Sequence, residues 1–534
     1  MKNNSFIFSA LVCFIFLQSC HKDSNPVTVS KSIATLEKTS GLKLNSVGDY
    51  GTYKFISSDA GLSAQIASFS LENGGTGNLA AYTGAGHQKW RITNVGNGNY
   101  TIMNMGSGKL AQSYNYNGVM LPVQNSADHA DDQLWIISSV GGNGYKVISK
   151  SSGLAVTANG SNYIQLQPYI GKASQIWGYN LLSPDSYRDD AVVGFFHRRL
   201  KTQGSIAFDQ GNSIPLSDGR VLWITQDAFD GIRVLPDGNL MCGFFQYHNS
   251  ILIQPATKSW NPDSTGNMTI ANSTANQPRQ ICNTQPGTDW SWPGMGFQQA
   301  NTVFMVCGEG KGLGATNTSI YELTVNSPGN DQWAVKRTLP AGIAGQTEVG
   351  YGLGFSKPGD GYIYTLGSKG VSFNASNIYA ARAAESDPRT WYFWNGTAWT
   401  TTRTTNSASV VATGQQNLAM CYVRGKYVLM QMDLGFFCDP SSHNIYLSTS
   451  NSITGPFTKP VKVFTIEDRY RGHLNRYYTP ACHPEFDNGK NELLLTYSVN
   501  FAACSTGNDC ANNELESKNY QVKGVRVPYS VIGL

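Results

Sequence analysis

One three-residue pattern recurs three times in the first third of the chain. The pattern is Gln-x-Trp, and its second and third copies follow after 45 and 42 positions: Gln88-Lys89-Trp90, Gln133-Leu134-Trp135 and Gln175-Ile176-Trp177. Each copy comes after a segment that alternates between apolar and polar residues as a strand does; these segments begin at Gly51, Gly98 and Gly144. Three copies at nearly equal spacing indicate a threefold structural repeat built from strands.

This repeat closely resembles the ricin-B-type β-trefoil over residues 43–181. The resemblance implies that each Trp packs in a shared core and that each Gln binds nearby backbone groups, so the triplets are structural. Sugar pockets of that family usually carry an aspartate just after a leucine, and the comparable places lack it: Leu62-Ser63, Leu110-Ala111 and Leu154-Ala155. An altered polysaccharide site and a purely structural spacer both remain open for this domain.

The start of the chain has the pattern of an export signal. Lys2 precedes an apolar run from Phe6 to Leu17, which ends in Leu17-Gln18-Ser19-Cys20 and resembles the lipobox of bacterial lipoproteins. The resemblance implies a signal peptide over 1–19, a lipid on Cys20, a tether over 20–42 and attachment to the outer membrane or cell surface. The run is shorter than the roughly 20 residues of a spanning helix, so the lipid alone would contact the membrane.

The amino-acid composition limits the classes of binding partner that we expect. Only 14% of the residues are charged, and the formal charge is +4. Since no Lys/Arg run could follow a phosphate backbone, nucleic-acid binding is disfavoured and a polysaccharide or oligosaccharide is the expected partner. We expect no required cofactor or catalytic metal, although a structural calcium ion fits such a protein. Among the cysteines beyond Leu240, Cys504 and Cys510 could close a short disulfide loop.

Residues 182–534 consist of short apolar runs separated by Gly, Asn, Asp and Pro. Several runs begin just after Asp-Gly, Arg-Gly or Asn-Gly, which is typical of sheets rich in hairpins. The length suits a propeller of about five blades, with a pair of β-sandwiches as the structural competitor. The predicted fold class is therefore all-β, a β-trefoil followed by a five-bladed β-propeller.

The most informative stretch of this second domain is a hairpin flanked by two aspartates, Asp209 and Asp227. Asp218-Gly219 predicts a two-residue turn, which would place Gln210 opposite Asp227 and the two aspartates at the same end of the hairpin. In strict register they would point to opposite faces, so a shared site requires an irregular backbone over 210–212. Pro215 indicates an edge strand, such as the innermost strand of a propeller blade.

This hairpin resembles a family of five-bladed propellers long catalogued as domains of unknown function and related to glycosidases that act on arabinan. Typical members read Gly-Asp-Gly, a short gap, then Ser-Val-Pro-Leu-x-Asp-Gly-Arg-x-Leu-Trp-Leu-Phe-Gly-Asp-Thr-Phe. The first aspartate matches Asp209 and the last matches Asp227, whereas Phe208, Gln226 and Ala228 depart from the pattern. The resemblance continues through Tyr351-Gly352, Trp391 to Trp399 and Tyr477 to Asn500.

A carboxylate pair suits glycosidic cleavage, because one acid must protonate the leaving oxygen and one carboxylate must activate water or attack the anomeric carbon. Asp209 and Asp227 are the candidate pair; the competing interpretation is that they are turn or strand-end residues. Other carboxylates near strand ends could serve instead: Glu309, Glu348, Asp433 and Asp439. The candidate substrate-binding residues are Trp290, Trp292, Tyr351, Tyr478, His483 and Asn500. Blade packing is the alternative for the two tryptophans, and a structural role is the alternative for His483.

The function that these patterns favour is an extracellular glycoside hydrolase acting on a polysaccharide, with an arabinan-like furanoside preferred. The first alternative is a surface glycan-binding lipoprotein that does not cleave. A polysaccharide lyase, which would need a base such as His483 or a tyrosine, is a third.

Overall fold

A computed structural model of the chain describes residues 51–534 apart from 161, 244, 436–437, 440, 442, 471, 504–509 and 511–512. The predicted signal peptide, the lipidation site Cys20 and the tether lie outside the described residues. Within the described part of the chain, no helix combines the length and the apolar character needed to cross a lipid bilayer. The described residues are almost entirely β-structure, which confirms the predicted fold class.

The first domain is a β-trefoil of twelve strands. Three strand pairs form its barrel, namely β1 with β12, β4 with β5 and β8 with β9. Three hairpins complete the threefold pattern, namely β2–β3, β6–β7 and β10–β11. The strands are β1 Thr52–Ser57, β2 Ser63–Ile66, β3 Gly75–Ala80, β4 Trp90–Gly96, β5 Asn99–Asn104, β6 Leu110–Tyr116, β7 Val119–Asn125, β8 Trp135–Gly141, β9 Gly144–Ser149, β10 Ala155–Asn159, β11 Tyr163–Gln167 and β12 Trp177–Leu182.

The three Gln-x-Trp triplets occupy equivalent places in this domain. Each Gln ends a short 3-10 turn and each Trp begins a barrel strand. The three indoles are buried, and each indole N–H donates to a backbone carbonyl, that of Ala64, Ala111 or Val156. Each Gln side chain donates to a second carbonyl, that of Ala81, Ser126 or Pro168. The prediction that the triplets are structural is confirmed.

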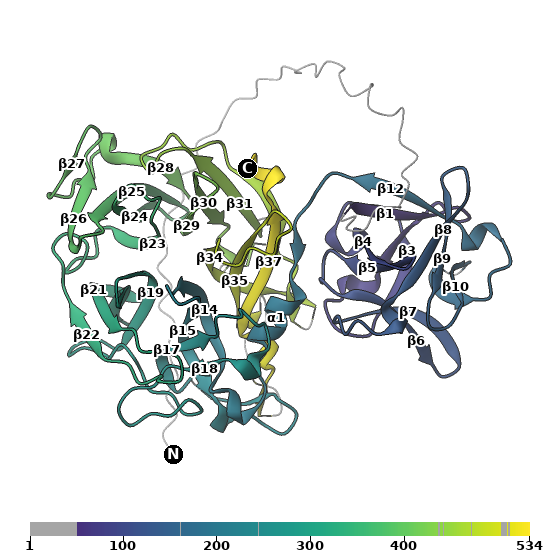
Figure 1. The fold of residues 1–534 in the computed structure, drawn as a ribbon, viewed down its shortest axis with the longest axis horizontal. Helices are drawn as coiled ribbons and strands as arrows, with labels where there is room; N and C mark the ends of the chain where they lie inside the picture. The colour runs from purple at the N-terminus through teal and green to yellow at the C-terminus, as the bar shows by residue number, and fades with distance from the viewer. Residues whose placement is uncertain are drawn as a thin grey trace, which may run out of the picture. The chain divides into compact units, whose positions relative to one another are not determined.

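The second domain is a ring of five antiparallel sheets, one per blade (Figure 1). Blade 1 contains β14 Ser205–Pro215, β15 Val221–Asp230, β17 Tyr247–Gln254 and β18 Gly266–Asn267. Blade 2 contains β19 Trp290–Gln299, β20 Thr302–Lys311, β21 Gly314–Thr324 and β22 Val335–Thr338. Blade 3 contains β23 Gly350–Ser356, β24 Tyr362–Ser372, β25 Ala375–Ala384, β26 Asp387–Trp394 and β27 Trp399–Thr400, with β28 Val410–Gly414 beside β25. Blade 4 contains β29 Asn417–Val423, β30 Lys426–Met432, β31 Asn444–Ser450 and β32 Val461–Thr465. Blade 5 contains β33 Arg469–Tyr470, β34 His473–His483, β35 Glu492–Ala503, β37 Gln521–Pro528 and β13 Tyr187–Arg188.

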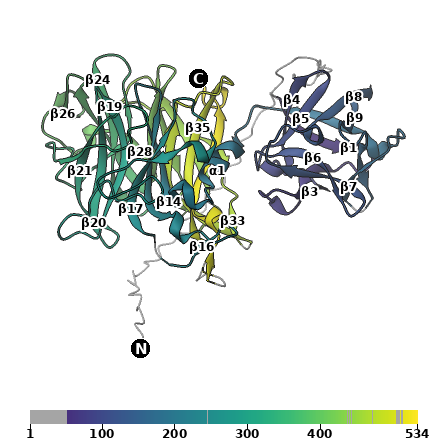
Figure 2. The same ribbon diagram turned by 60° about the horizontal axis from the view of Figure 1, so that its bottom comes forward.

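The innermost strands close the ring. β14 contacts β19, which contacts β23, then β29, then β34, and β34 contacts β14 again. Figure 2 turns the blades toward an edge-on view, with strands of neighbouring blades side by side. Apolar side chains fill the space between successive blades, and the helix α1 Asp190–Phe196 joins the layer between blades 5 and 1. The five-bladed propeller is therefore confirmed over a sandwich pair, and Pro215 lies on an innermost strand as predicted.

The ring is completed by strands from distant parts of the sequence. β13 precedes the first blade but pairs with β37 in the fifth, where Tyr187 lies opposite Arg526. Each blade otherwise takes its strands from one continuous stretch of the chain, so this pairing joins the fifth blade to the segment that leads into the first.

The turn between β14 and β15 differs from the prediction. The amide N–H of Leu216 donates to the carbonyl of Arg220, and Gly219 N–H donates to Leu216, so the loop has three residues rather than two. Gly219 adopts φ of 89°, a left-handed conformation that three-residue hairpin loops need at their last position. The extra loop residue moves the register by one position, so Leu216, not Ser217, faces Arg220.

The predicted short disulfide loop is wrong. Cys510 pairs with Cys242 across 268 positions, and Cys504 lies outside the described residues. The bond lies beside a small two-stranded sheet made of β16 Leu240–Met241 and β36 Glu514–Leu515. It therefore fastens the connection after β15 in blade 1 to the connection before β37 in blade 5.

Removing this disulfide should destabilise the propeller. We expect the double variant Cys242→Ala, Cys510→Ala to lose about 2–5 kcal/mol of unfolding free energy, because the unfolded chain regains the freedom that the cross-link removes. Urea denaturation followed by tryptophan fluorescence measures the loss. Cys282→Ala is the matched control, since Cys282 is buried but not disulfide-bonded. A midpoint that moves no further than in this control would contradict the prediction.

Candidate functional site

The irregular backbone that a shared site requires is present in β14. Asn212 pairs with Ile224, but Asp209 pairs with Gln226, so the register shifts between Asp209 and Asn212. Gln210 has φ of 62° and Asp227 has φ of 43°, both in the left-handed region that non-glycine residues seldom adopt. The predicted irregularity is confirmed, and it lies between the two candidate carboxyl groups.

Gly211 is the residue that allows this irregularity next to blade 5. A Cβ atom at Gly211 would lie 2.5 Å from the Cγ1 atom of Val522 on β37, closer than packed carbon atoms can be. The amide N–H of Gln210 donates to Ser498 Oγ on β35 at 2.9 Å. The irregular segment is therefore held against the fifth blade.

Asp209 is a buried acid held by two tyrosines. Its exposed fraction is 7%, and Tyr478 O–H donates to Asp209 Oδ1, with a second hydrogen bond from Tyr520. Burial raises the pKa of Asp209 well above its ordinary value, and the charge of Asp227 adds to that rise, while the two tyrosine hydrogen bonds oppose it. Asp209 thus favours the protonated form.

Tyr478 and Asn500, which the sequence predicts as substrate-binding residues, lie at this acid, and their contact with a substrate stays a prediction. Asn500 Nδ2–H donates to the Tyr478 hydroxyl at 2.8 Å, and this hydroxyl in turn donates to Asp209. Burial and the neighbouring Asp209 charge raise the pKa of Tyr478 well above its ordinary value. Tyr478 therefore keeps its proton and acts as a hydrogen-bond donor.

Asp227 has a different environment. Its side chain is 13% exposed, and Asp227 Oδ1 accepts from Trp292 Nε1–H at 3.0 Å and lies 2.9 Å from His248 Nδ1. His248 is on β17, next to β15 in the same blade. Two nitrogen atoms on separate strands thus fix one carboxylate oxygen, which leaves the other oxygen available.

The two aspartates are within electrostatic reach of each other. The charge of Asp227 raises the pKa values of Asp209, Tyr478 and Tyr520 alike. The carboxyl group of Asp209 is desolvated and favours its neutral form, whereas that of Asp227 is partly solvated and is held by nitrogen atoms of His248 and Trp292. Acids whose surroundings separate them in this way are the usual arrangement for one proton donor and one carboxylate.

Trp290 and Trp292 have different environments in the structure. Trp290 and Trp292 stack with ring centroids 3.7 Å apart, but Trp290 is buried and its indole N–H donates to the Gly312 carbonyl. Trp292 covers Trp290 and bonds to Asp227. The prediction of a platform made of both rings is corrected: Trp290 is blade packing that supports Trp292, and Trp292 alone lies at the carboxylate.

Tyr351 and His483 do not lie in an open site. Tyr351 packs against Phe393 in the apolar layer between blades 2 and 3. His483 is 0% exposed, and its ring nitrogens lie 2.6 Å from Ser213 Oγ and 2.7 Å from Thr496 Oγ1. His483 has no exposed surface and both of its ring nitrogens are engaged, so its predicted substrate contact is corrected to a structural role. Tyr351 is 5% exposed, and its predicted substrate contact stays a prediction.

The alternative carboxylates are engaged elsewhere. Glu309 accepts two hydrogen bonds from Arg337, at 2.6 and 2.7 Å, and these partners hold the pKa of Glu309 below its usual value against the opposing effect of burial. The others also have partners within the protein: Glu348 with Lys369 and Arg403, Asp433 with Gln415 and Asn444, and Asp439 with Ser441. Asp209 and Asp227 remain the better pair.

Two site residues were missed at the sequence level, His248 and Tyr520. His248 stands in no motif, and its proximity to Asp227 depends on how far the connection between β15 and β17 runs before β17 begins. Tyr520 comes from the end of a 3-10 turn before β37. Throughout the described ranges of 51–534, no three His, Cys, Asp or Glu residues are grouped so that they could hold a metal ion. The structural calcium ion stays a prediction.

Comparisons with known proteins agree with both folds. The family described as "Domain of unknown function (DUF5005)" matches residues 189–528, and the family described as "Ricin-type beta-trefoil lectin domain-like" matches 43–125 and 86–166. No curated protein matches the chain.

Among solved structures, a candidate hydrolase from Bacteroides ovatus is 18% identical with a TM-score of 0.52, covering 65% of this chain and 92% of its own; at that identity the likeness shows the fold alone. The designed threefold protein ThreeFoil is 24% identical, with a TM-score of 0.24, over 25% of this chain and 99% of its own. A Macrolepiota procera ricin B-like lectin in complex with lactose is 15% identical, with a TM-score of 0.22, over 25% of this chain and 98% of its own.

The match over 189–528 takes in all five blades and the hairpin that carries Asp209 and Asp227. Because it spans more than half of the sequence, the chain belongs to the DUF5005 family.

Proposed function

We propose that the protein is a glycoside hydrolase that cleaves a polysaccharide outside the cell, with Asp209 and Asp227 as its two carboxyl groups. The observation that carries this proposal is the contrast between them: a buried acid with a raised pKa lies within electrostatic reach of a partly exposed carboxylate. Glycosidic cleavage needs one group of each kind.

The roles follow from the surroundings. Asp209, which keeps its proton, donates it to the glycosidic oxygen as the bond to the anomeric carbon breaks. Asp227 either attacks that carbon or takes a proton from an attacking water. Tyr478 and Asn500 hold Asp209, while His248 and Trp292 hold Asp227 and leave one of its oxygens free to react.

The wider setting belongs to the same proposal. An arabinan-like furanoside is the favoured substrate, with the trefoil holding the protein on polysaccharide. A lipid on Cys20 would keep the protein at the outer membrane or cell surface. The reaction needs no cofactor, and nucleic acid is not an expected partner.

A second candidate function is a glycan-binding protein that does not cleave. The observation that favours it is the burial of Asp209, whose exposed fraction is 7%. A carboxyl group held by Tyr478 and Tyr520 could serve as a fixed hydrogen-bond centre in the wall of a binding site. The two candidates differ in whether Asp209 reaches the glycosidic oxygen when a sugar is bound.

Product analysis separates the functions. The protein is incubated with arabinan, other plant polysaccharides, and microbial and mycobacterial glycans, and released oligosaccharides are separated by chromatography. We expect products with saturated reducing ends from an arabinofuranose-containing polymer. Unsaturated ends that absorb in the ultraviolet would indicate a lyase and contradict the proposal. Binding without release of any product would establish the second candidate.

A further inference from the structure

A pocket of about 560 Å³ lies at the start of β17 in blade 1. Its link to the carboxylate pair is His248. His248, which contacts Asp227, forms part of its wall, and Phe245 packs against the His248 ring with centroids 5.1 Å apart. The opposite wall comes from the segment that connects β18 to β19, here called the blade 1–2 connector (residues 268–289). It contributes Arg279 and Gln280.

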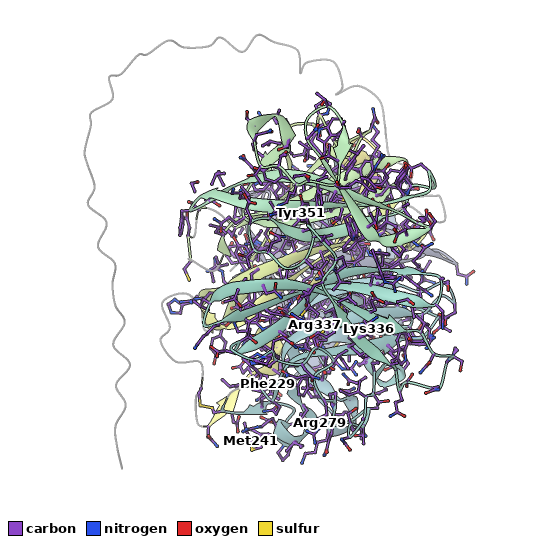
Figure 3. The ribbon with its side chains drawn as sticks, turned by 90° about the vertical axis from the view of Figure 1, so that its left-hand side faces the viewer. Phe229, Met241, Arg279, Lys336, Arg337 and Tyr351 are labelled. Atoms are coloured by element: carbon purple, nitrogen blue, oxygen red, sulfur yellow. A yellow bond between two sulfur atoms is a disulfide. The ribbon has the colours of Figure 1, made fainter. Side chains whose placement is uncertain are left out.

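A second pocket, of about 710 Å³, shares part of its lining with the first. The two share Arg279 and Gln280, so the connector forms a common wall for both. The second pocket extends over the edge of blade 2, where it is lined by Tyr321, Trp333 and Arg337. Figure 3 labels Arg279 and Arg337. Each pocket has the size of a complete small-molecule site, about 300–1,000 Å³, so the two in series exceed what one sugar residue fills.

The charges along this path suit a neutral, hydroxyl-rich ligand. Among the described residues Arg279 makes no ion pair, whereas Arg337 is neutralised by Glu309. Asp289 and Asp230 line the first pocket and would repel an acidic chain. The side-chain amide of Gln280 is already engaged, because its oxygen accepts from the His248 backbone N–H and its nitrogen donates to Thr284. Arg279 as a donor and the exposed Asp289 as an acceptor are therefore more available to a ligand than Gln280.

We propose that the two pockets form one extended groove that binds several consecutive neutral sugar residues of a polymer, outward from Asp227 along the blade 1–2 connector to blade 2. This inference rests on the proposed hydrolysis for its placement of the reacting bond. It adds that the substrate is a chain rather than a short oligosaccharide. Arg279, shared by both pockets, donates hydrogen bonds to hydroxyl groups midway along that chain.

Chain-length dependence tests the groove. The probes are α-1,5-linked arabino-oligosaccharides of two and six residues, and the variants are Arg279→Ala, which removes the donor, and Ala271→Trp, which fills the second pocket. We expect kcat/KM for the hexasaccharide to fall about 10-fold or more in each variant, because Arg279→Ala removes a charged hydrogen bond and Ala271→Trp excludes the sugar residues that the second pocket would hold. For the disaccharide, the change should stay within about 2-fold. Lys336→Ala is the matched control, because Lys336 is exposed on β22 beside Arg337 and lies outside the described lining of both pockets.

Binding measurements keep this inference separate from the proposed reaction. Isothermal titration calorimetry with the hexasaccharide uses the Asp227→Asn background, in which cleavage is absent. If the protein never hydrolyses a glycan but Arg279→Ala and Ala271→Trp weaken hexasaccharide binding, the hydrolase proposal is wrong and the groove stands. If hydrolysis proceeds with the same preference for long chains in both variants, the groove is overturned. If the hexasaccharide neither binds nor is cleaved, both are overturned.

Discussion

Replacing Asp227 with asparagine should lower kcat/KM for the polysaccharide by about 10³–10⁵-fold, since it removes the carboxylate that we propose attacks the sugar or activates water. Asparagine has the same shape and can still accept from His248 and Trp292, so the melting temperature should change little. Chromatography of released products measures the rate, and differential scanning calorimetry measures the stability.

Asp218→Asn is the matched control for this variant. Asp218 lies in the turn at the other end of the same hairpin, where it pairs with Arg220, and its replacement should leave turnover within about 2-fold. Azide adds a second measurement. It uses Asp227→Gly, which leaves room where the carboxylate stood. If Asp227 is the nucleophile, azide enters that space, attacks the anomeric carbon and restores turnover, with a glycosyl azide as the product. Retained turnover in Asp227→Asn without azide would dismiss the assignment of this residue.

Replacing Asp209 with asparagine should lower kcat/KM for the natural oligosaccharide by about 10²–10⁴-fold, because no proton then reaches the leaving oxygen. The loss should be much smaller for a 4-nitrophenyl glycoside of the same sugar, because 4-nitrophenolate leaves without being protonated. Comparing the two substrates in the same variant is the measurement. Equal losses on both would show that Asp209 is not the proton donor.

The pH dependence of kcat/KM is an independent test of the role of Asp209. If Asp209 is the proton donor, only its protonated form is active, and because its pKa is raised, kcat/KM for the oligosaccharide should fall as the pH rises through that raised pKa. Asp209→Asn should remove this alkaline limb. Tyr478→Phe should move it to higher pH, because the Tyr478 hydrogen bond favours the ionised form of Asp209 and opposes the rise. If neither variant alters the alkaline limb, the limb reports the ionisation of a group other than Asp209.

Local patterns predicted much of this molecule. The Gln-x-Trp spacing predicted the trefoil because the fold repeats the same hydrogen bonds in each third, and Pro215 predicted an innermost strand because a residue without an N–H cannot pair on both sides. The need for an irregular segment near Gly211 followed from strand alternation alone. These features depend on neighbours in sequence, so they can be read without coordinates.

The errors arose where the outcome depends on distant packing. His483 stands in a motif that resembles the family, yet its side chain is unexposed and bonded on both ring nitrogens to Ser213 and Thr496. Successive side chains in a strand point to opposite faces, so a shift of one residue exchanges buried and exposed positions. His248 and the groove were missed for the same reason: both depend on the course of long connections after β15 and β18.

The pairing of β13 with β37 sets the order in which this protein can be assembled. Tyr187 and Arg526 lie 339 positions apart, so closing the circle requires almost the entire polypeptide and makes the step slow, as contacts of high sequence separation are. The trefoil, whose strands all precede residue 183, can fold while the later blades are still being synthesised. Until β37 is in place, β35 has an unpaired edge to which strands of other chains could add, so the incomplete propeller is prone to aggregation.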